Sequence, residues 1–193
     1  MIPPRHPLLV RITHWVNTLA FISLTVSGAA ILIAHPRLYW GETGAFGSPA
    51  LIELPLPLNL DQSGWGRSLH FLAAWVCVLN GTAYGLSGLA SRHFTNGMST
   101  YNGIQRFAYR GVVFVLFPLM IATGLAMSPA VMAALPPIVH TFGGYQSSRT
   151  IHFFVTNLLL LFLAAHVAMV SLSGFKNLMR GMITGRDSAK EFL

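Results

Sequence analysis

Four long apolar stretches are the feature of this sequence that most restricts its fold. They run from about residue 11 to 34, 67 to 90, 105 to 128 and 149 to 172. At about 1.5 Å of rise per residue, a helix of this length crosses the roughly 30 Å hydrocarbon core of a bilayer. Isolated glycines and Pro118 are tolerated in membrane helices. We therefore predict an all-α membrane protein, a four-helix transmembrane bundle that forms one domain over residues 1–193.

Composition and charge agree with this class and suggest an orientation. Only 9% of the residues are charged, against about 25% in a soluble domain. Nine basic residues flank the spans on one side of the predicted membrane: Arg5, Arg11, Arg92, Arg106, Arg110, Lys176, Arg180, Arg186 and Lys190. Three lie on the other side, with all three outer acids: Arg37, Arg67 and Arg149, beside Glu42, Glu53 and Asp61. Since basic residues favour the cytoplasm, both termini are expected there. We interpret the first span as a membrane helix that stays in the protein and is not a cleaved signal peptide. We interpret the net charge of +7 as a consequence of the membrane orientation and expect no nucleic-acid partner.

Cysteine usage limits the cofactor chemistry. Cys77 is the single cysteine and lies inside an apolar run. The chain therefore has no internal disulfide, no CxxC metal pair and no CxxCH motif for covalent haem attachment.

Four histidines lie in or at the edge of the spans, where ionisable residues are costly and usually functional. They are His14, His70, His152 and His166. Fourteen residues separate the last two, so they share one helix face about 21 Å apart, near opposite sides of the bilayer. With the predicted orientation, His14 matches the depth of His166, and His70 matches that of His152.

Two depth-matched pairs of histidines suit two haems, each iron held by two axial imidazoles. Such sites leave no position open for oxygen, which favours electron transfer. Alternatively, a lone membrane histidine hydrogen-bonds a neighbouring helix, and a metal transporter could use histidines as a pathway, although the spans lack the carboxylates such ions favour. His6, His35, His93 and His140 lie in termini or connections and are interpreted as solvated.

Glycines on the histidine faces fit either of two roles. Gly28 lies fourteen residues after His14, and Gly81 and Gly85 lie eleven and fifteen residues after His70. A flat macrocycle needs nearby backbone without a side chain, but small residues four apart also serve close helix packing.

The chain resembles the bacterial di-haem cytochrome b family. This group includes cytochrome b561-like proteins, nickel-iron hydrogenase b-type subunits, the formate dehydrogenase gamma subunit and thiosulfate-reductase-type subunits. The resemblance rests on RITHWVNTLAF, LHFLAAWVCVLNG, YNGIQRFAYRGV, GGYQSSRTIHFFVTNLLLLFLAAHVAMV and MITGR. It implies that His14 and His166 hold a cytoplasmic-side haem b, and that His70 and His152 hold an outer one. It also implies the bacterial inner membrane.

The segment YNGIQ carries a second implication of this resemblance. In formate-dehydrogenase-like members a similar segment lies at a quinone pocket, which implies that Asn102 and Gln105 contact quinone. Their amides can hydrogen-bond a quinone carbonyl. Asn102 could instead cap the third helix.

The expected function is electron transfer between the quinone pool and a periplasmic redox partner, a molybdopterin oxidoreductase by resemblance. The alternatives are a stand-alone superoxide-to-quinone oxidoreductase and the His-lined transporter. The connection from residue 35 to 66 is long and shows no clear secondary structure. Long structureless connections are usually functional, so we expect this one to pack near the outer haem and help to dock the partner; the alternative is a disordered loop or one that lies along the membrane interface.

Overall fold

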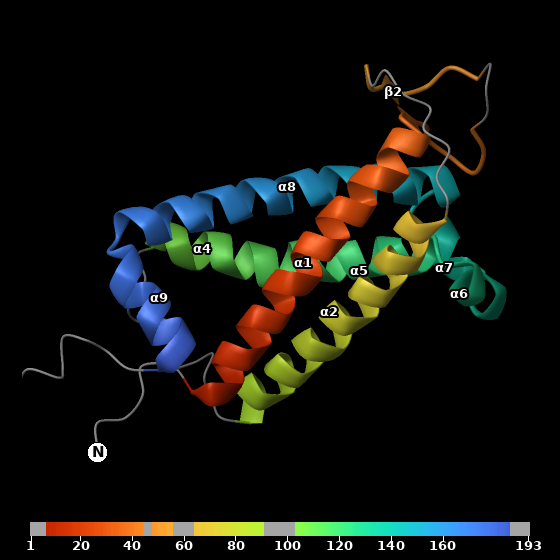
Figure 1. Ribbon diagram of the computed structural model, residues 1–193. Helices are drawn as coiled ribbons and strands as arrows, with labels where there is room; N and C mark the ends of the chain where they lie inside the picture. Colours follow the sequence, from red (N-terminus) through yellow and green to blue (C-terminus); the bar gives the residue numbers. More distant parts are fainter. Residues whose placement is uncertain (1–6, 45–47, 56–63, 91–102, 186–193) are drawn as a thin grey trace, which may run out of the picture. The chain divides into compact units, whose positions relative to one another are not determined.

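Four helices long and apolar enough to cross a membrane account for the predicted spans (Figure 1). The computed structural model describes residues 7–44, 48–55, 64–90 and 103–185. The first, second and fourth spans are single helices: α1 (Leu8–Ala34), α2 (Trp65–Ala90) and α8 (Tyr145–Leu172). The third is made of α4 (Gly103–Gly111), a π-helical turn η2 (Val112–Leu116) and α5 (Phe117–Ala126). The all-α class and the four spans are confirmed, and the cytoplasmic location of the termini stays a prediction.

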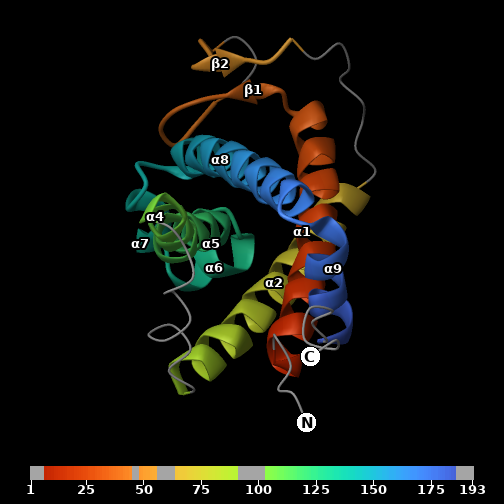
Figure 2. The same ribbon diagram turned by 90° about the vertical axis from the view of Figure 1, so that its left-hand side faces the viewer.

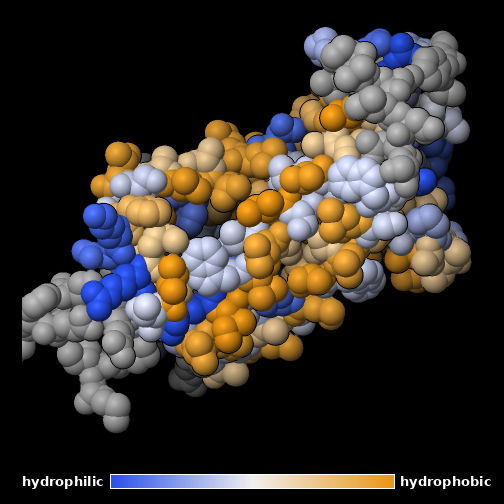
Figure 3. All heavy atoms as spheres, viewed as in Figure 1, coloured by the Kyte–Doolittle hydropathy of each residue, from blue (hydrophilic) through white to orange (hydrophobic). Residues whose placement is uncertain are grey.

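The surfaces of these helices are those of a protein whose solvent is lipid. Large apolar side chains point outward, as shown by Leu19, which is 68% exposed, and Leu161, which is 67% exposed. Figure 3 shows such hydrophobic side chains over the helices on one face. In water, an apolar surface of this extent would drive association. The multi-pass membrane location follows from this surface and the four spans.

The buried positions of α1 are occupied by small residues. Thr13, Ala20 and Ser27 are buried and lie seven residues apart, so they share one face of the helix. Small residues allow the backbones of membrane helices to approach closely. Close backbone approach in turn lets a serine hydroxyl on α1 reach a side chain of a neighbouring helix.

The third span contains an irregularity that the sequence analysis did not predict. We expected one continuous α-helix with a tolerated Pro118, whereas the N–H of Phe117 donates to the carbonyl of Val112, five residues back. Pro118 has no N–H, and in a regular α-helix its ring would clash with the carbonyl of Phe114. A π turn placed just before the proline relieves this conflict within the span.

The connections also contain elements that we did not predict. Within the described ranges, three further helices lie outside the spans: α6 (Pro129–Ala134), α7 (Pro137–His140) and α9 (Phe175–Thr184). Strand β1 (Arg37–Leu38) pairs antiparallel with β2 (Ile52–Glu53), with Arg37 opposite Glu53. The expectation that the connection from residue 35 to 66 lacks secondary structure was therefore wrong for this part of it.

The described residues form two compact units. The first unit contains α1 up to Leu32, α2, the end of α8 from Ala165 and α9. The second contains the end of α1 from Ile33, both strands, α4 to α7, and α8 up to Ala164. Our expectation of one domain over residues 1–193 stays a prediction.

In the first unit, polar contacts join α1 to α2 and to α9. Ser27 of α1 meets His70 of α2, and Asn80 of α2 donates from Nδ2 to the carbonyl of Thr13 at 2.7 Å. The order of these contacts makes the two helices antiparallel. Helix α9 lies beside the N-terminal part of α1 (Figures 1 and 2), where Arg11 and Trp15 both donate to the carbonyl of Met182.

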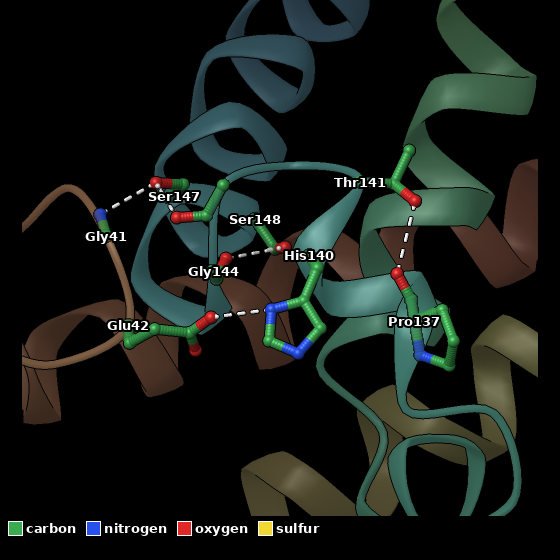
Figure 4. Close-up of polar contacts among 9 residues, drawn as sticks. Gly41, Glu42, Pro137, His140, Thr141, Gly144, Ser147 and Ser148 are labelled. Carbon is green, nitrogen blue, oxygen red and sulfur yellow. Dashed lines mark hydrogen bonds and ion pairs between the residues drawn. The ribbon is translucent and has the colours of Figure 1, made fainter.

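In the second unit, the segment after α1 closes over the N-terminus of α8. The Gly41 carbonyl accepts from the N–H groups of Gln146 and Ser147 at 2.9 and 3.2 Å, and the Ser147 hydroxyl accepts from the Gly41 N–H at 2.7 Å (Figure 4). Thr150 donates to the Tyr39 carbonyl at 2.6 Å. Because the first N–H groups of a helix lack partners within it, the Gly41 carbonyl acts as a backbone cap for α8.

Ion pairs hold the same segment. Arg37 donates to Glu53 from Nε at 2.9 Å and Nη2 at 2.7 Å across the strand pair. This hydrogen bond and the charge of Glu53 raise the pKa of Arg37, so the guanidinium stays charged. Nδ1 of His140 lies 3.1 Å from Glu42 (Figure 4). We had interpreted His140 as a solvated loop residue; it is 70% exposed, and it has this acidic partner.

Candidate functional site

Two of the predicted histidines meet within the first unit. His14 comes from the first half of α1 and His166 from the last third of α8, and both side chains are partly exposed. Their ring centroids are 6.4 Å apart, with the ring planes inclined by 58°. An imidazole nitrogen binds a first-row metal at about 2 Å and lies about 1.1 Å from its ring centre, so two axial imidazoles on one metal have centroids about 6.3 Å apart. The spacing of the His14 and His166 rings therefore fits one iron between them.

One aromatic and one polar residue lie near His14 along α1. The Trp15 ring meets it edge to face, with centroids 5.4 Å apart. Asn17 lies about one turn further along α1, and its buried Oδ1 has no hydrogen-bond partner in the described part of the chain. A buried polar atom of this kind calls for a polar partner. The surroundings of His14 thus suit a cofactor that has both an apolar body and polar groups.

Ser27 of α1 contacts His70 within the same unit. Nδ1 of His70 lies 3.0 Å from the Ser27 hydroxyl, and that hydroxyl also lies 2.6 Å from the Ser23 carbonyl. A Cβ added at the adjacent Gly28 would lie 3.4 Å from Cε1 of His70, so this glycine leaves space beside the imidazole. We expected Gly28 either to make room for a macrocycle or to serve helix packing; its neighbour is the ring of a candidate ligand.

His152 is held in the same way within the second unit. Its Nδ1 lies 3.0 Å from the Thr123 hydroxyl of α5, which also lies 2.8 Å from the Leu119 carbonyl. A Cβ added at Gly124 would lie 3.5 Å from Cε1 of His152. His70 and His152 belong to different units, so their pairing stays a prediction.

The other predicted site residues have different outcomes. A Cβ at Gly81 or Gly85 would meet no atom within 4 Å in the described chain, which leaves both of their predicted roles open. Gln105 lies in α4, but its side chain is outside the described residues, as is the whole of Asn102. Their contact with quinone stays a prediction.

Sequence reasoning missed the polar residues that contact the histidines or join their helices. Ser27, Thr123 and Asn80 were not singled out, although each places a polar group inside an apolar span. The available signal was a hydroxyl residue followed by glycine, at 27–28 and again at 123–124. The same pattern recurs at 43–44, 63–64, 87–88, 173–174 and 184–185, which makes this signal weak without coordinates.

Comparison with known proteins places this site in a family. The sequence profile of the prokaryotic cytochrome b561 family matches residues 5–185. A protein of Azospira oryzae named "Putative protein-methionine-sulfoxide reductase subunit YedZ1" is 27% identical over 195 residues, which cover 86% of this chain and 90% of that protein. No solved structure matches the chain. Nearly the whole chain, with all four membrane histidines, thus falls within one family match, and the protein belongs to the prokaryotic cytochrome b561 family, membrane b-type cytochromes that bind haem b and transfer electrons.

Proposed function

We propose that this chain binds two b haems, one between His14 and His166 and one between His70 and His152. The observation that carries the proposal is the 6.4 Å separation of the His14 and His166 ring centroids, which suits two imidazoles on one iron. For the second pair, the support is the similar hold on each ring, from Ser27 and from Thr123. A bound b haem with two axial imidazoles supplies one-electron redox chemistry.

We infer further that the chain carries electrons between quinone and a redox protein on the outer side of a bacterial inner membrane. Asn102 and Gln105 would hydrogen-bond the quinone carbonyls, because they enter the third span on the side that the basic residues assign to the cytoplasm. The Azospira oryzae relative is named as a reductase subunit. That name favours an electron-transfer subunit over a stand-alone enzyme, and electron flow from quinol towards the partner.

The partner would dock on the segment that carries β1 and β2. Trp40 and Leu51 in this segment are 60% and 57% exposed, beside the charged pair of Arg37 and Glu53. Apolar residues with a polar rim are typical of protein interfaces. A molybdopterin oxidoreductase is the partner class that the resemblance implies.

Haem analysis of purified variants tests the ligand assignment. The pyridine haemochrome of the unchanged protein should give two b haems per chain and no covalently attached haem. His14→Ala and His70→Ala should each lose one haem and keep the other, because each removes one ligand of one pair. His140→Ala, outside the spans, is the matched control and should keep both.

Two results would contradict the proposal. One haem per chain in the unchanged protein would reject the two-site arrangement. Loss of both haems from either single variant, with the protein still folded by circular dichroism, would reject the pairing.

A further inference from the structure

The two histidines assigned to the outer haem are held by a repeated arrangement that the proposed function does not require. A hydroxyl–glycine pair, Ser27–Gly28 on α1, faces His70 on α2. A second hydroxyl–glycine pair, Thr123–Gly124 on α5, faces His152 on α8. The hydroxyl-to-Nδ1 distance is 3.0 Å in both, and a Cβ added at the glycine would lie 3.4 Å from Cε1 of His70 and 3.5 Å from Cε1 of His152.

The position of the imidazole proton follows from counting hydrogens. A serine or threonine hydroxyl has one hydrogen to donate and two lone pairs. The Ser27 hydroxyl lies 2.6 Å from the Ser23 carbonyl and the Thr123 hydroxyl lies 2.8 Å from the Leu119 carbonyl, and a carbonyl can only accept. Each hydroxyl therefore gives its hydrogen to its own helix and accepts from the histidine. Nδ1 carries the proton in His70 and in His152, and Nε2 keeps the lone pair that a metal needs.

Burial strengthens the hydrogen bonds between these hydroxyls and the histidines. Ser27 and Thr123 are both 0% exposed, so water does not compete for the hydroxyls. A hydrogen bond in a low-dielectric interior is stronger than in water, and losing it leaves a buried group unsatisfied. A Cβ added at Gly28 or Gly124 would lie against the Cε1 edge of the ring, so the two glycines leave room for the imidazoles beside the neighbouring helices.

We propose that Ser27 and Thr123 are positioning residues that fix the tautomer and orientation of His70 and His152 and thereby set the reduction potential of the outer haem. This inference rests on the proposed function for its redox consequence, but its structural part concerns the imidazoles alone. A hydrogen bond accepted from the Nδ1–H of a ligand raises the basicity of that ligand and favours the more oxidised metal. Without these hydroxyls the outer haem should be easier to reduce.

Matched substitutions separate this role from ordinary packing. Ser27→Ala and Thr123→Val remove the acceptor with little change in shape, whereas Ser27→Thr and Thr123→Ser retain it. Thr25→Ala is the control, because the Thr25 hydroxyl makes the same kind of contact within α1, at 2.9 Å from the Phe21 carbonyl.

Two measurements on the purified protein in lipid nanodiscs decide the matter. In a redox titration, Ser27→Ala and Thr123→Val should each lower the ferric-to-ferrous ratio of one haem, at fixed ambient potential, by about fivefold, the size expected for one hydrogen bond. The other haem, Thr25→Ala and the hydroxyl-retaining variants should be unchanged. Nitrogen-15 NMR of histidine-labelled reduced protein should find the proton of His70 and His152 on Nδ1.

The outcomes distinguish this inference from the proposed function. Unchanged potentials in both hydroxyl-free variants, with two haems present, would overturn the positioning role and leave the haem assignment intact. A proton on Nε2 of His70 or His152 would overturn it whether or not haem is bound. A haem-free unchanged protein would reject the proposed function, and the NMR result would still decide the tautomers.

Discussion

At the scale of single residues, the chemistry of a membrane histidine depends on which ring nitrogen is available. A spanning sequence shows that a histidine is present, but the neighbouring helix decides what it can do. Ser27 illustrates this dependence, because its hydroxyl reaches Nδ1 of His70 only when α1 and α2 approach closely. Asn80 assists that approach by binding the α1 backbone at Thr13, the residue before His14.

The predicted quinone contact is tested at this scale. Gln105→Ala should slow reduction of the haems by quinol roughly tenfold, because it removes a neutral hydrogen bond to the bound quinone and leaves its pocket polar groups unpaired. The haem spectrum and haem content should not change. Stopped-flow absorbance with a short-chain quinol measures the rate, with Asn157→Ala as the control amide; Asn157 is exposed and bonds its own helix at the Phe153 carbonyl.

The Asn102→Ala variant is a second test of the predicted quinone contact. Unaltered quinol kinetics in both the Asn102 and the Gln105 variants would exclude this segment from the quinone pocket. A slowed rate accompanied by haem loss would also count against it, since the proposed role is in quinone binding alone.

At the scale of elements, the cap of α8 depends on two consecutive glycines that precede it. Gly143 and Gly144 have φ of +77° and +116°, conformations that L side chains rarely adopt. A Cβ at Gly144 would lie 2.4 Å from the Gly41 carbonyl oxygen, whereas one at Gly143 would lie 3.5 Å from the Ser147 hydroxyl. The two positions therefore share a backbone requirement and differ in the space available.

Alanine at each glycine should separate these two effects. Gly143→Ala should cost about 1–2 kcal/mol for the left-handed backbone, a fall of roughly 2–8 °C in Tm. Gly144→Ala should lower the Tm at least twice as far, because the Gly41 carbonyl that caps α8 must also move. Differential scanning fluorimetry in detergent, with haem absorbance as a second probe, makes the comparison. Equal falls in Tm would show that the contact between Gly41 and Gly144 contributes nothing.

An element can be predicted from sequence when the interactions that form it are local along the chain. The four spans were predictable, because each satisfies its own backbone and its apolar length is a local property. The π turn at Val112–Leu116 depends on how the helix accommodates Pro118, which composition does not report. The strand pair of Arg37 and Glu53 joins residues sixteen apart through a contact that no local pattern indicates. For the same reason, the four histidines were identified from sequence, but Ser27 and Thr123 were not.

At the scale of the whole molecule, the predicted orientation places the strand pair on the outer face. Trp40→Ser together with Leu51→Ser should slow oxidation of the haems by the partner about tenfold, since exposed aromatic and aliphatic anchors dominate many interfaces. Haem content and reduction by quinol should persist. Point substitutions are cleaner than shortening residues 50–60, because β2 lies within that segment.

A control on the same predicted face makes this prediction specific. Leu135→Ser changes a leucine of similar exposure, 61%, in the connection between α6 and α7, and it should leave partner oxidation unchanged. The orientation is checked by replacing Cys77 with alanine and Leu51 with cysteine, since the chain has no other cysteine. A membrane-impermeant maleimide should label intact cells. Labelling only after lysis would place the strand pair in the cytoplasm and reject this docking surface.

The π turn in the third span also bears on how the length of this chain can vary. An i to i+5 turn holds one residue more than an α-helical turn, so Val112–Leu116 is the place where a residue can be gained or lost without breaking the helix. Each residue rotates an α-helix by about 100°. The wider π turn absorbs that rotation, so a deletion there combined with replacement of Pro118 would leave a regular α-helical turn, with α4 facing as before and Thr123 in place beside His152. Relatives one residue shorter in this segment are therefore expected to lack the proline, to keep the Thr-Gly pair and to present the same face of α4.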